Sequence, residues 1–409
     1  MPDVATLRSA IEIDESLRSV FWNNESAILQ SILGIDPTLM PEVLAVLAST
    51  RFHFGKVRPR ASNDPWSRSE VHRILHQYFQ RQPFAFKWSY VDALVIDQIY
   101  GHIRFFVDDF ASSVLSTHVV TGEKQSTPAP LSPNEKCRLE RAFLRFELFC
   151  NLFRERGYGR DRFSPDELHD SFFKKFAPWE NEELACINDY MCAKITIPFN
   201  DVADHDIRWG EDRIYAYEEC CPEAESYTQG TISQGLAYIR RLVTAPTFQE
   251  RCELLGEFPE RDYDFFLEGL RVDYKEDDVR RPLSHYDENQ KKALASKSSI
   301  EDPDPGPFNA WYWAHARDYR QGFFCEREHM LLRERGYVMW DQWRLLEWNL
   351  FGKPFEEEDY PYPVDHLTEE RQEEVEESWD IRREIFRNGG RGWWSKDDES
   401  KIVWLKPGT

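Results

Sequence analysis

Residues 136–154 read KCRLERAFLRFELFCNLFR, and their pattern predicts a strong helix. Its apolar side chains recur at the i, i+3, i+4 spacing of an α-helix. One predicted face carries Leu139, Phe143, Phe146, Phe149, Cys150 and Phe153, and a second strip carries Leu144, Leu148 and Leu152. A helix with two apolar faces is packed from two directions, so this one is predicted to be central.

Helix-start signals recur on both sides of this stretch. SPNE and SPDE place Ser132 and Ser164 at N-caps, each followed by Pro and closed three residues later by Glu in a capping box. Strand signals are confined to THVVTG at 117–122 and KIVWL at 401–405. The sequence therefore predicts an all-α (mainly α) protein, a multi-helix body of a dozen or more helices with few short strands.

Five residues, RERGY, occur at 154–158 and again at 333–337. The residues before the two copies differ, which argues against a duplicated domain. Arg and Gly suit the end of a helix, since Gly adopts the left-handed conformation and the next apolar residue packs back on the last turn. We expect two similar helix ends and no repeated site.

Polar and Pro-rich stretches divide the chain into segments. We expect an F-box-like helical region at 1–50, a helical segment at 51–120, a Pro/Ser/Thr loop at 121–134, a central helical body at 135–283, a polar loop at 284–307, Trp-rich helices at 308–351 and an acidic C-terminal extension at 352–409.

Composition limits the classes of partner. The 409 residues hold 73 acidic and 51 basic side chains, a net charge of −22, which disfavours nucleic acid and anionic lipid as partners. Eight scattered Cys without a C-x-x-C pattern are typical of reduced thiols. No apolar run approaches the ~18 residues of a membrane span, and the N-terminus does not resemble a secretory signal. We expect a cytoplasmic or nuclear protein that needs no cofactor.

Two clusters of ligand-type side chains stand out. His72 and His76 lie four residues apart, a spacing that can place two imidazoles on one metal, but histidines flanking an apolar stripe explain it better. Asp204, His205 and Asp206 lie in NDVADHDIRWGED and could act as acid and base. A polar turn that caps the next helix is the alternative interpretation.

Tryptophans gather in two C-terminal stretches. NAWYWAHARDY holds Trp311 and Trp313, and YVMWDQWRLLEWNLF holds Trp340 and Trp343, predicted on one helical face. Indoles can wall a small-molecule pocket or anchor a protein interface, whereas a core of large side chains is the more common use.

Residues 17–48, LRSVFWNNESAILQSILGIDPTLMPEVLAVLA, resemble a pattern in filamentous-fungal F-box-like proteins of unassigned function. Residues 139–153, 176–190 and 199–210 resemble blocks of the same group. The resemblance implies a Skp-type adaptor bound at the N-terminus and a target recruited by the remainder. The matching stretch corresponds to the second half of an F-box, so we expect either a degenerate box or a chain start inside one.

The leading hypothesis is therefore a non-catalytic helical protein-interaction module. Its expected partner-facing positions are Leu17, Val20, Phe21, Ile28, Leu29, Ile32 and Leu33. One alternative is an enzyme or binding protein for an aromatic small molecule, which would use the four tryptophans with Asp204 and His205. Another is a regulatory subunit whose acidic run at 356–380 docks on a basic partner.

Overall fold

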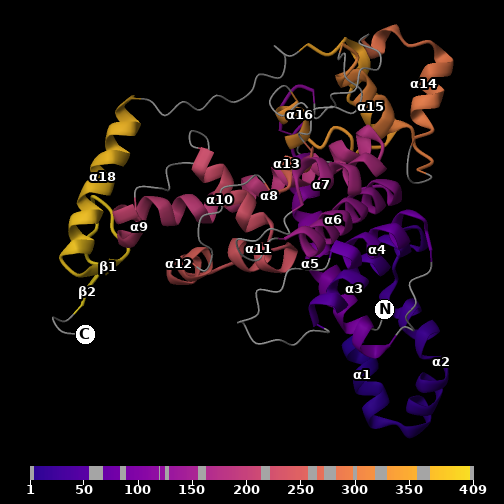
Figure 1. Ribbon diagram of the computed structural model, residues 1–409, viewed down its shortest axis with the longest axis horizontal. Coiled ribbons are helices and arrows are strands. Elements are labelled where there is room, and N and C mark those ends of the chain that lie inside the picture. The colour runs from indigo at the N-terminus through magenta and orange to yellow at the C-terminus, as the bar shows by residue number, and fades with distance from the viewer. Residues whose placement is uncertain are drawn as a thin grey trace. The chain divides into compact units, whose positions relative to one another are not determined.

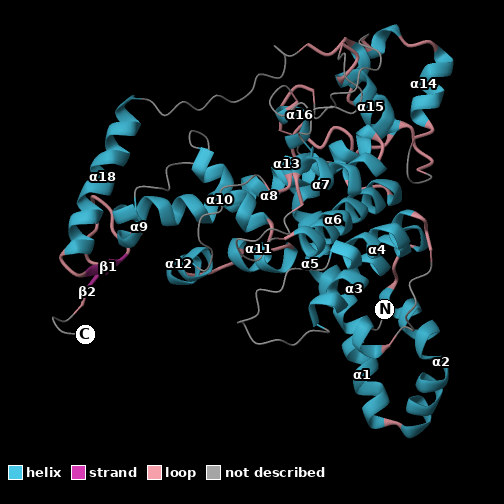
Figure 2. Ribbon diagram, in the orientation of Figure 1, coloured by secondary structure: helices cyan, strands magenta, loops and turns pink. Residues whose placement is uncertain are grey.

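The computed structural model describes residues 4–54, 68–82, 89–118, 120–124, 129–154, 163–212, 222–256, 265–270, 282–297, 302–317, 329–356 and 369–405. Across these ranges the elements are helical apart from two short strands near the C-terminus (Figures 1 and 2). The predicted all-α class is confirmed.

The chain divides into two units, one of residues 1–187 and 269–360 and the other of residues 188–268 and 361–409. Unit 1 contains α1 (Val4–Ile13), α2 (Glu15–Leu33), η1 (Pro37–Leu39), α3 (Met40–Phe54), α4 (Arg68–Phe79), α5 (Tyr90–Leu115), α6 (Pro133–Phe153), α7 (Pro165–Ser171), η2 (Phe173–Lys175), η3 (Leu283–His285), α14 (Glu288–Ala295), α15 (Gly306–Ala314), α16 (Met330–Glu334), α17 (Gln342–Glu347) and η4 (Leu350–Gly352). Unit 2 contains α9 (Ile207–Asp212), α10 (Pro222–Ile232), α11 (Leu236–Val243), α12 (Phe248–Gly256), α18 (Glu369–Arg387), β1 (Gly390–Gly392) and β2 (Ile402–Trp404). α8 (Pro178–His205) begins in unit 1 and ends in unit 2, and α13 (Leu267–Leu270) begins in unit 2 and ends in unit 1.

These units differ from the segments expected from the sequence. The stretch 135–283, expected to be one body, is shared between both units, and 361–409, expected to be an extension, completes unit 2. The expected loop at 284–307 includes α14, because Asp287 and Gln290 form a capping box there. A helix with so few apolar residues gives little periodic signal, so composition alone suggested a loop.

The predicted central helix is confirmed as α6, which packs against α3 and α5. Both predicted apolar strips are buried, and the rings of Phe149 and Phe153 join those of Phe172 and Phe173 in one aromatic cluster. The capping boxes at Ser132 and Ser164 are both formed.

Unit 1 also buries charged side chains on α6. Arg145 contacts Glu180 at 3.0 Å and Glu42 at 3.7 Å, with all three side chains at most 1% exposed. Arg138 contacts Asp302 at 2.9 Å and Asp341 at 3.4 Å. These pairs fix how α6 meets α3, α8 and the segments around 302 and 341, since each buried charge needs its partner.

The second RERGY copy ends α16 as predicted. Gly336 has φ of +60°, its N–H donates to the oxygen of Arg333, and the N–H of Tyr337 donates to the oxygen of Leu332. This is a Schellman motif, and Tyr337 packs into the core. The first copy's Gly157 lies outside the described residues.

Among the described helices, none is by itself long and apolar enough to cross a bilayer. The bent pair Ala27–Leu33 and Pro37–Thr50 meets the length and composition criteria when taken together.

Candidate functional site

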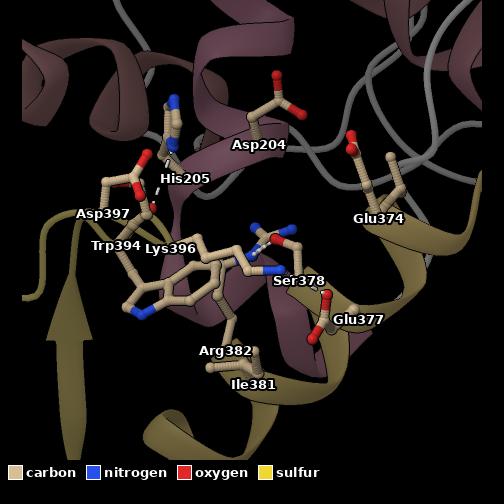
Figure 3. Close-up of a pocket in the computed structure, with 12 residues that line it drawn as sticks. Asp204, His205, Glu374, Glu377, Ser378, Ile381, Arg382, Trp394, Lys396 and Asp397 are labelled. Atoms are coloured by element: carbon tan, nitrogen blue, oxygen red, sulfur yellow. Dashed lines mark hydrogen bonds and ion pairs between the residues drawn. The ribbon is translucent and has the colours of Figure 1, made fainter. Parts of the chain in front are cut away.

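A cleft of about 340 Å³ lies within unit 2, between the end of α8, α18 and the residues that follow β1 (Figure 3). Carboxylates of Asp204, Glu374, Glu377 and Asp397 line it, with Lys396 and Arg382 as cations. Val375, Ile381 and the indole of Trp394 supply apolar wall, and His205 and Ser378 complete the polar part. Its volume lies at the low end of the range for small-molecule sites.

The cleft exists because the chain turns sharply after α8. The Asp206 carboxylate accepts from the N–H groups of Arg208 and Trp209 at 2.9 and 3.1 Å, which caps α9. Asp206 is buried, accepts from the Cys252 thiol at 3.3 Å, and has its pKa raised by that burial. The capping interpretation therefore holds for Asp206, which does not line the cleft.

Arg382 joins α18 to this turn. Its Nη1 donates to the main-chain oxygens of Ala203 and Asp206, both at 2.8 Å, and its Nε donates to Ser378 Oγ at 3.2 Å. The side chain is 1% exposed, and burial lowers the pKa of Arg382 to about 10, an effect that the charges of Asp204 and Asp206 oppose. The guanidinium satisfies carbonyls at the end of α8, a structural role for a buried cation.

His205 is held by the same segment. Its Nδ1 lies 3.0 Å from the oxygen of Trp394, and the N–H of Trp394 donates to the oxygen of His205 at 2.9 Å. Because a carbonyl only accepts, Nδ1 carries a proton, and Nε2 is the ring nitrogen that this contact leaves for other partners. The indole of Trp393 also packs on the imidazole, with centroids 4.6 Å apart and planes tilted by 34°, which further fixes the ring.

Charge decides what the cleft attracts. Lys396 donates to Glu377 at 3.1 Å, while Arg382 is engaged with main-chain oxygens. Four carboxylates against two cations leave the lining acidic, so it favours a cationic group over an anionic one. His205 and Asp204, which both line the cleft, are candidate acid–base groups.

Of the predicted acid–base residues, Asp204 and His205 line the cleft. The sequence did not identify Trp394, Lys396, Glu374 or Glu377 as their neighbours, because these lie about 170 residues or more downstream. The only local signal was the tryptophan pair next to charged residues in WWSKDDE.

The predicted tryptophans do not line this cleft. Trp311 and Trp340 are buried in the core of unit 1, where Trp311 packs on Trp179 and Trp340 on Trp348. Trp313 donates its indole N–H to the oxygen of Lys353, and Trp343 is 46% exposed. The expected single face of Trp340 and Trp343 is wrong, because α17 begins only at Gln342 and Trp340 lies outside it.

His72 and His76 are both exposed on α4, and His72 lies edge-on to Phe163. Within the described ranges, no three His, Cys, Asp or Glu side chains are grouped so as to hold a metal ion.

The seven predicted partner-facing positions split into three groups. Phe21, Leu29 and Leu33 are buried, and Ile28 and Ile32 are partly covered. Leu17 and Val20 are 50% and 55% exposed in the first turns of α2. The helices α1, α2 and α5 contact one another. They expose four further apolar side chains: Ile13, Trp22, Val91 and Leu94. We call these six exposed residues the N-terminal apolar surface.

No protein-family model, curated protein or solved structure matches this chain.

Proposed function

We propose that the chain is a non-catalytic, F-box-like helical interaction module that binds a protein partner through its N-terminal apolar surface. The observation that carries the proposal is the exposure of these six side chains, between 39% and 84%, on three contacting helices. Exposed apolar side chains gathered on one part of a protein are typical of interaction sites. Burial of Phe21, Leu29 and Leu33 beneath supports a rigid platform.

A Skp-type adaptor is the partner class that the fungal F-box resemblance implies, and we propose it as the first to test, in the cytoplasm or nucleus. The buried positions on α2 would then hold the helix on the body, and Leu17 and Val20 would meet the adaptor. The net charge of −22 argues against nucleic acid or an anionic membrane as the partner.

The test compares binding of a purified Skp-type adaptor to the full chain and to Leu17→Asp/Val20→Asp, by biolayer interferometry. Ile197→Asp is the matched control, since Ile197 is 70% exposed on α8 in unit 2. We expect the double variant to lose at least about tenfold in affinity, the scale of a buried apolar contact replaced by charge. No binding by the wild type, or equal binding by all three proteins, would reject the proposal.

A second candidate function is the binding of a small aromatic cation in the cleft. It is favoured by one observation, that Asp204 and His205 lie with the indole of Trp394 in one cavity with an acidic lining. Calorimetric titration with benzylamine, and with benzoate as its charge-reversed counterpart, tests it. We expect heat from benzylamine alone, weakened in Asp204→Asn, and the absence of any benzylamine signal would remove this candidate.

A further inference from the structure

Two buried histidines lie against each other in unit 1, and neither belongs to the N-terminal apolar surface or to the residues that line the cleft. His315 follows α15 and His329 is the N-cap residue of α16, with ring centroids 4.2 Å apart and planes tilted by 46°. They are 1% and 2% exposed. Histidine is the side chain whose charge ordinarily changes between pH 5 and 8, so a buried pair is a candidate pH-dependent element.

His329 is held as a neutral ring. Its Nε2 lies 3.3 Å from the main-chain oxygen of Ala314, which can only accept, so Nε2 carries the proton. Among the residues that the structure describes, its buried Nδ1 has no hydrogen-bond partner. A proton added at Nδ1 would be an unpaired N–H on a buried cation, which is among the costliest groups to bury.

The charged neighbours make this cost larger. Burial holds the pKa of His329 well below its usual range, and the nearby bases His315, which follows α15, and Arg333 on α16 lower that pKa further. The carboxylate from α8, Glu182, contacts His315 at 3.7 Å and Arg333 at 3.9 Å, and Tyr337 contacts His315 at 3.4 Å. The Glu182 carboxylate is therefore already shared between His315 and Arg333.

The segment at 353–356 also packs against this site. Phe355 covers the ring of His329, and the carboxylate of Glu356 pairs with Arg317.

We propose that the His329–Ala314 contact is an acid-sensitive latch that holds the end of α15 against the start of α16. The contact satisfies the main-chain oxygen of Ala314 at the end of α15. The ring of Phe355 covers the His329 ring, and the two ring centroids are 5.0 Å apart. When His329 gains a proton, the latched arrangement has to bury a charged ring with an unpaired N–H. That arrangement becomes unfavourable, and the two helix ends separate. The ring of Phe355 then loses its support.

The direction in which pH shifts the equilibrium between the open and latched states follows from proton linkage. In the open state His329 titrates near the ordinary value of about 6.5, whereas in the latched state it stays neutral, so the open state binds more protons below that pH. Acid therefore favours opening. From pH 7.5 to 5.5, one such histidine raises the ratio of open to latched molecules about tenfold.

The test is hydrogen–deuterium exchange on the full chain at pH 7.5 and 5.5, with protection factors corrected for intrinsic rates. We expect peptides over 306–317 and 329–337 to lose about tenfold in protection on acidification. His329→Gln keeps a side-chain N–H for Ala314 but cannot take up the proton, so this loss should disappear. His76→Gln is the control, since His76 is exposed on α4 and its removal should leave the wild-type response. An equal acid response in His329→Gln and wild type would overturn the latch.

A variant with altered stability would still be informative, since the quantity compared is the change with pH within each protein. Long-range ¹H–¹⁵N spectra of the histidine-labelled wild type give a second test. We expect the His329 ring to remain neutral, with the proton on Nε2, well below pH 6. Titration of this ring near 6.5 in the folded protein would equally reject the proposal.

Discussion

Gly210 on α9 lies so close to Arg382 on α18 that a Cβ at position 210 would come within 2.5 Å of the Cβ of Arg382. A Cβ there would also lie 3.1 Å from the main-chain nitrogen of Arg383. The obstructing atoms belong to the backbone region of α18 and cannot rotate away. This contact sets the distance between the two helices and so keeps Arg382 over the end of α8.

Gly210→Ala should therefore destabilise unit 2, by about 1–3 kcal/mol for an overpacked helix contact. Urea unfolding followed by tryptophan fluorescence measures the loss. Gly230→Ala is the matched control in α10, because no atom lies within 4 Å of a Cβ at that position. Since alanine favours a helix over glycine by up to ~1 kcal/mol, this control should be neutral or stabilising. A Gly210→Ala protein as stable as its control would show that α9 and α18 do not pack this closely.

Much of unit 1 follows from the sequence because its information is local. The two apolar strips of α6 repeat with the helical period, and the boxes at Ser132 and Ser164 mark where helices begin. The partners of buried charges are a different matter. Arg145 and Glu42 are 103 residues apart, and neither the period nor the caps indicate that they meet in the core.

Arg145→Met should cost about 3–5 kcal/mol, because it leaves Glu180 and Glu42 as buried carboxylates without their cation. Arg145 also donates to Tyr78 at 3.2 Å, so the phenol loses a partner as well. Glu180→Gln in the same chain removes one of the two stranded charges. The double variant should therefore be more stable than the sum of the single losses predicts, measured as a double-mutant cycle in urea. Strict additivity would mean that the two residues do not interact.

Glu183 is a buried carboxyl group that makes the stability of the fold depend on pH. It is buried on α8, 4.0 Å from Arg138, and burial raises its pKa to about 8. In the unfolded chain the carboxyl titrates near 4.5, so between 4.5 and about 8 the folded state binds more protons. This group's contribution to stability is thus present at low pH and is lost as pH rises through that window.

Glu183→Gln removes the titration while keeping the shape. The variant should gain stability relative to wild type as pH rises from 5 to about 9, and the gain should level off above the folded pKa. Thermal unfolding at several pH values checks this. Glu373→Gln, an exposed carboxylate on α18, should give a difference that does not change with pH in this range. A constant difference for Glu183→Gln too would show that Glu183 is ionised when folded.

The cleft shows where local information ends. A short acidic stretch suggests Asp204, His205 and Asp206 as candidate acid–base residues, and the first two line the cavity. Asp206 belongs to the same stretch, but its carboxylate turns inward to cap α9. The opposite wall comes from α18 and the residues after β1, which no pattern in the sequence links to α8. The tryptophan that lines the cleft, Trp394, was therefore not among the four predicted.

The two SPxE boxes look alike in the sequence, yet the structure distinguishes them. Ser164 is exposed and, within the described residues, accepts from the N–H of Glu167 at 3.3 Å. Ser132 accepts from the N–H of Glu135 at 3.1 Å, and its hydroxyl also donates to the buried carboxylate of Asp341 at 2.5 Å. Ser164 therefore caps a helix, whereas Ser132 caps a helix and also completes the Arg138–Asp341 network.

Ser164→Ala should cost about 1 kcal/mol, the typical loss of an N-cap. Ser132→Ala should cost about 2–3 kcal/mol, because the buried carboxylate of Asp341 also loses a hydrogen-bond donor. Ser132→Thr keeps the hydroxyl and should recover most of the difference. Chemical denaturation of the three variants in one buffer measures the order. Equal losses for the two alanine variants would mean that the Ser132–Asp341 bond adds nothing beyond the cap.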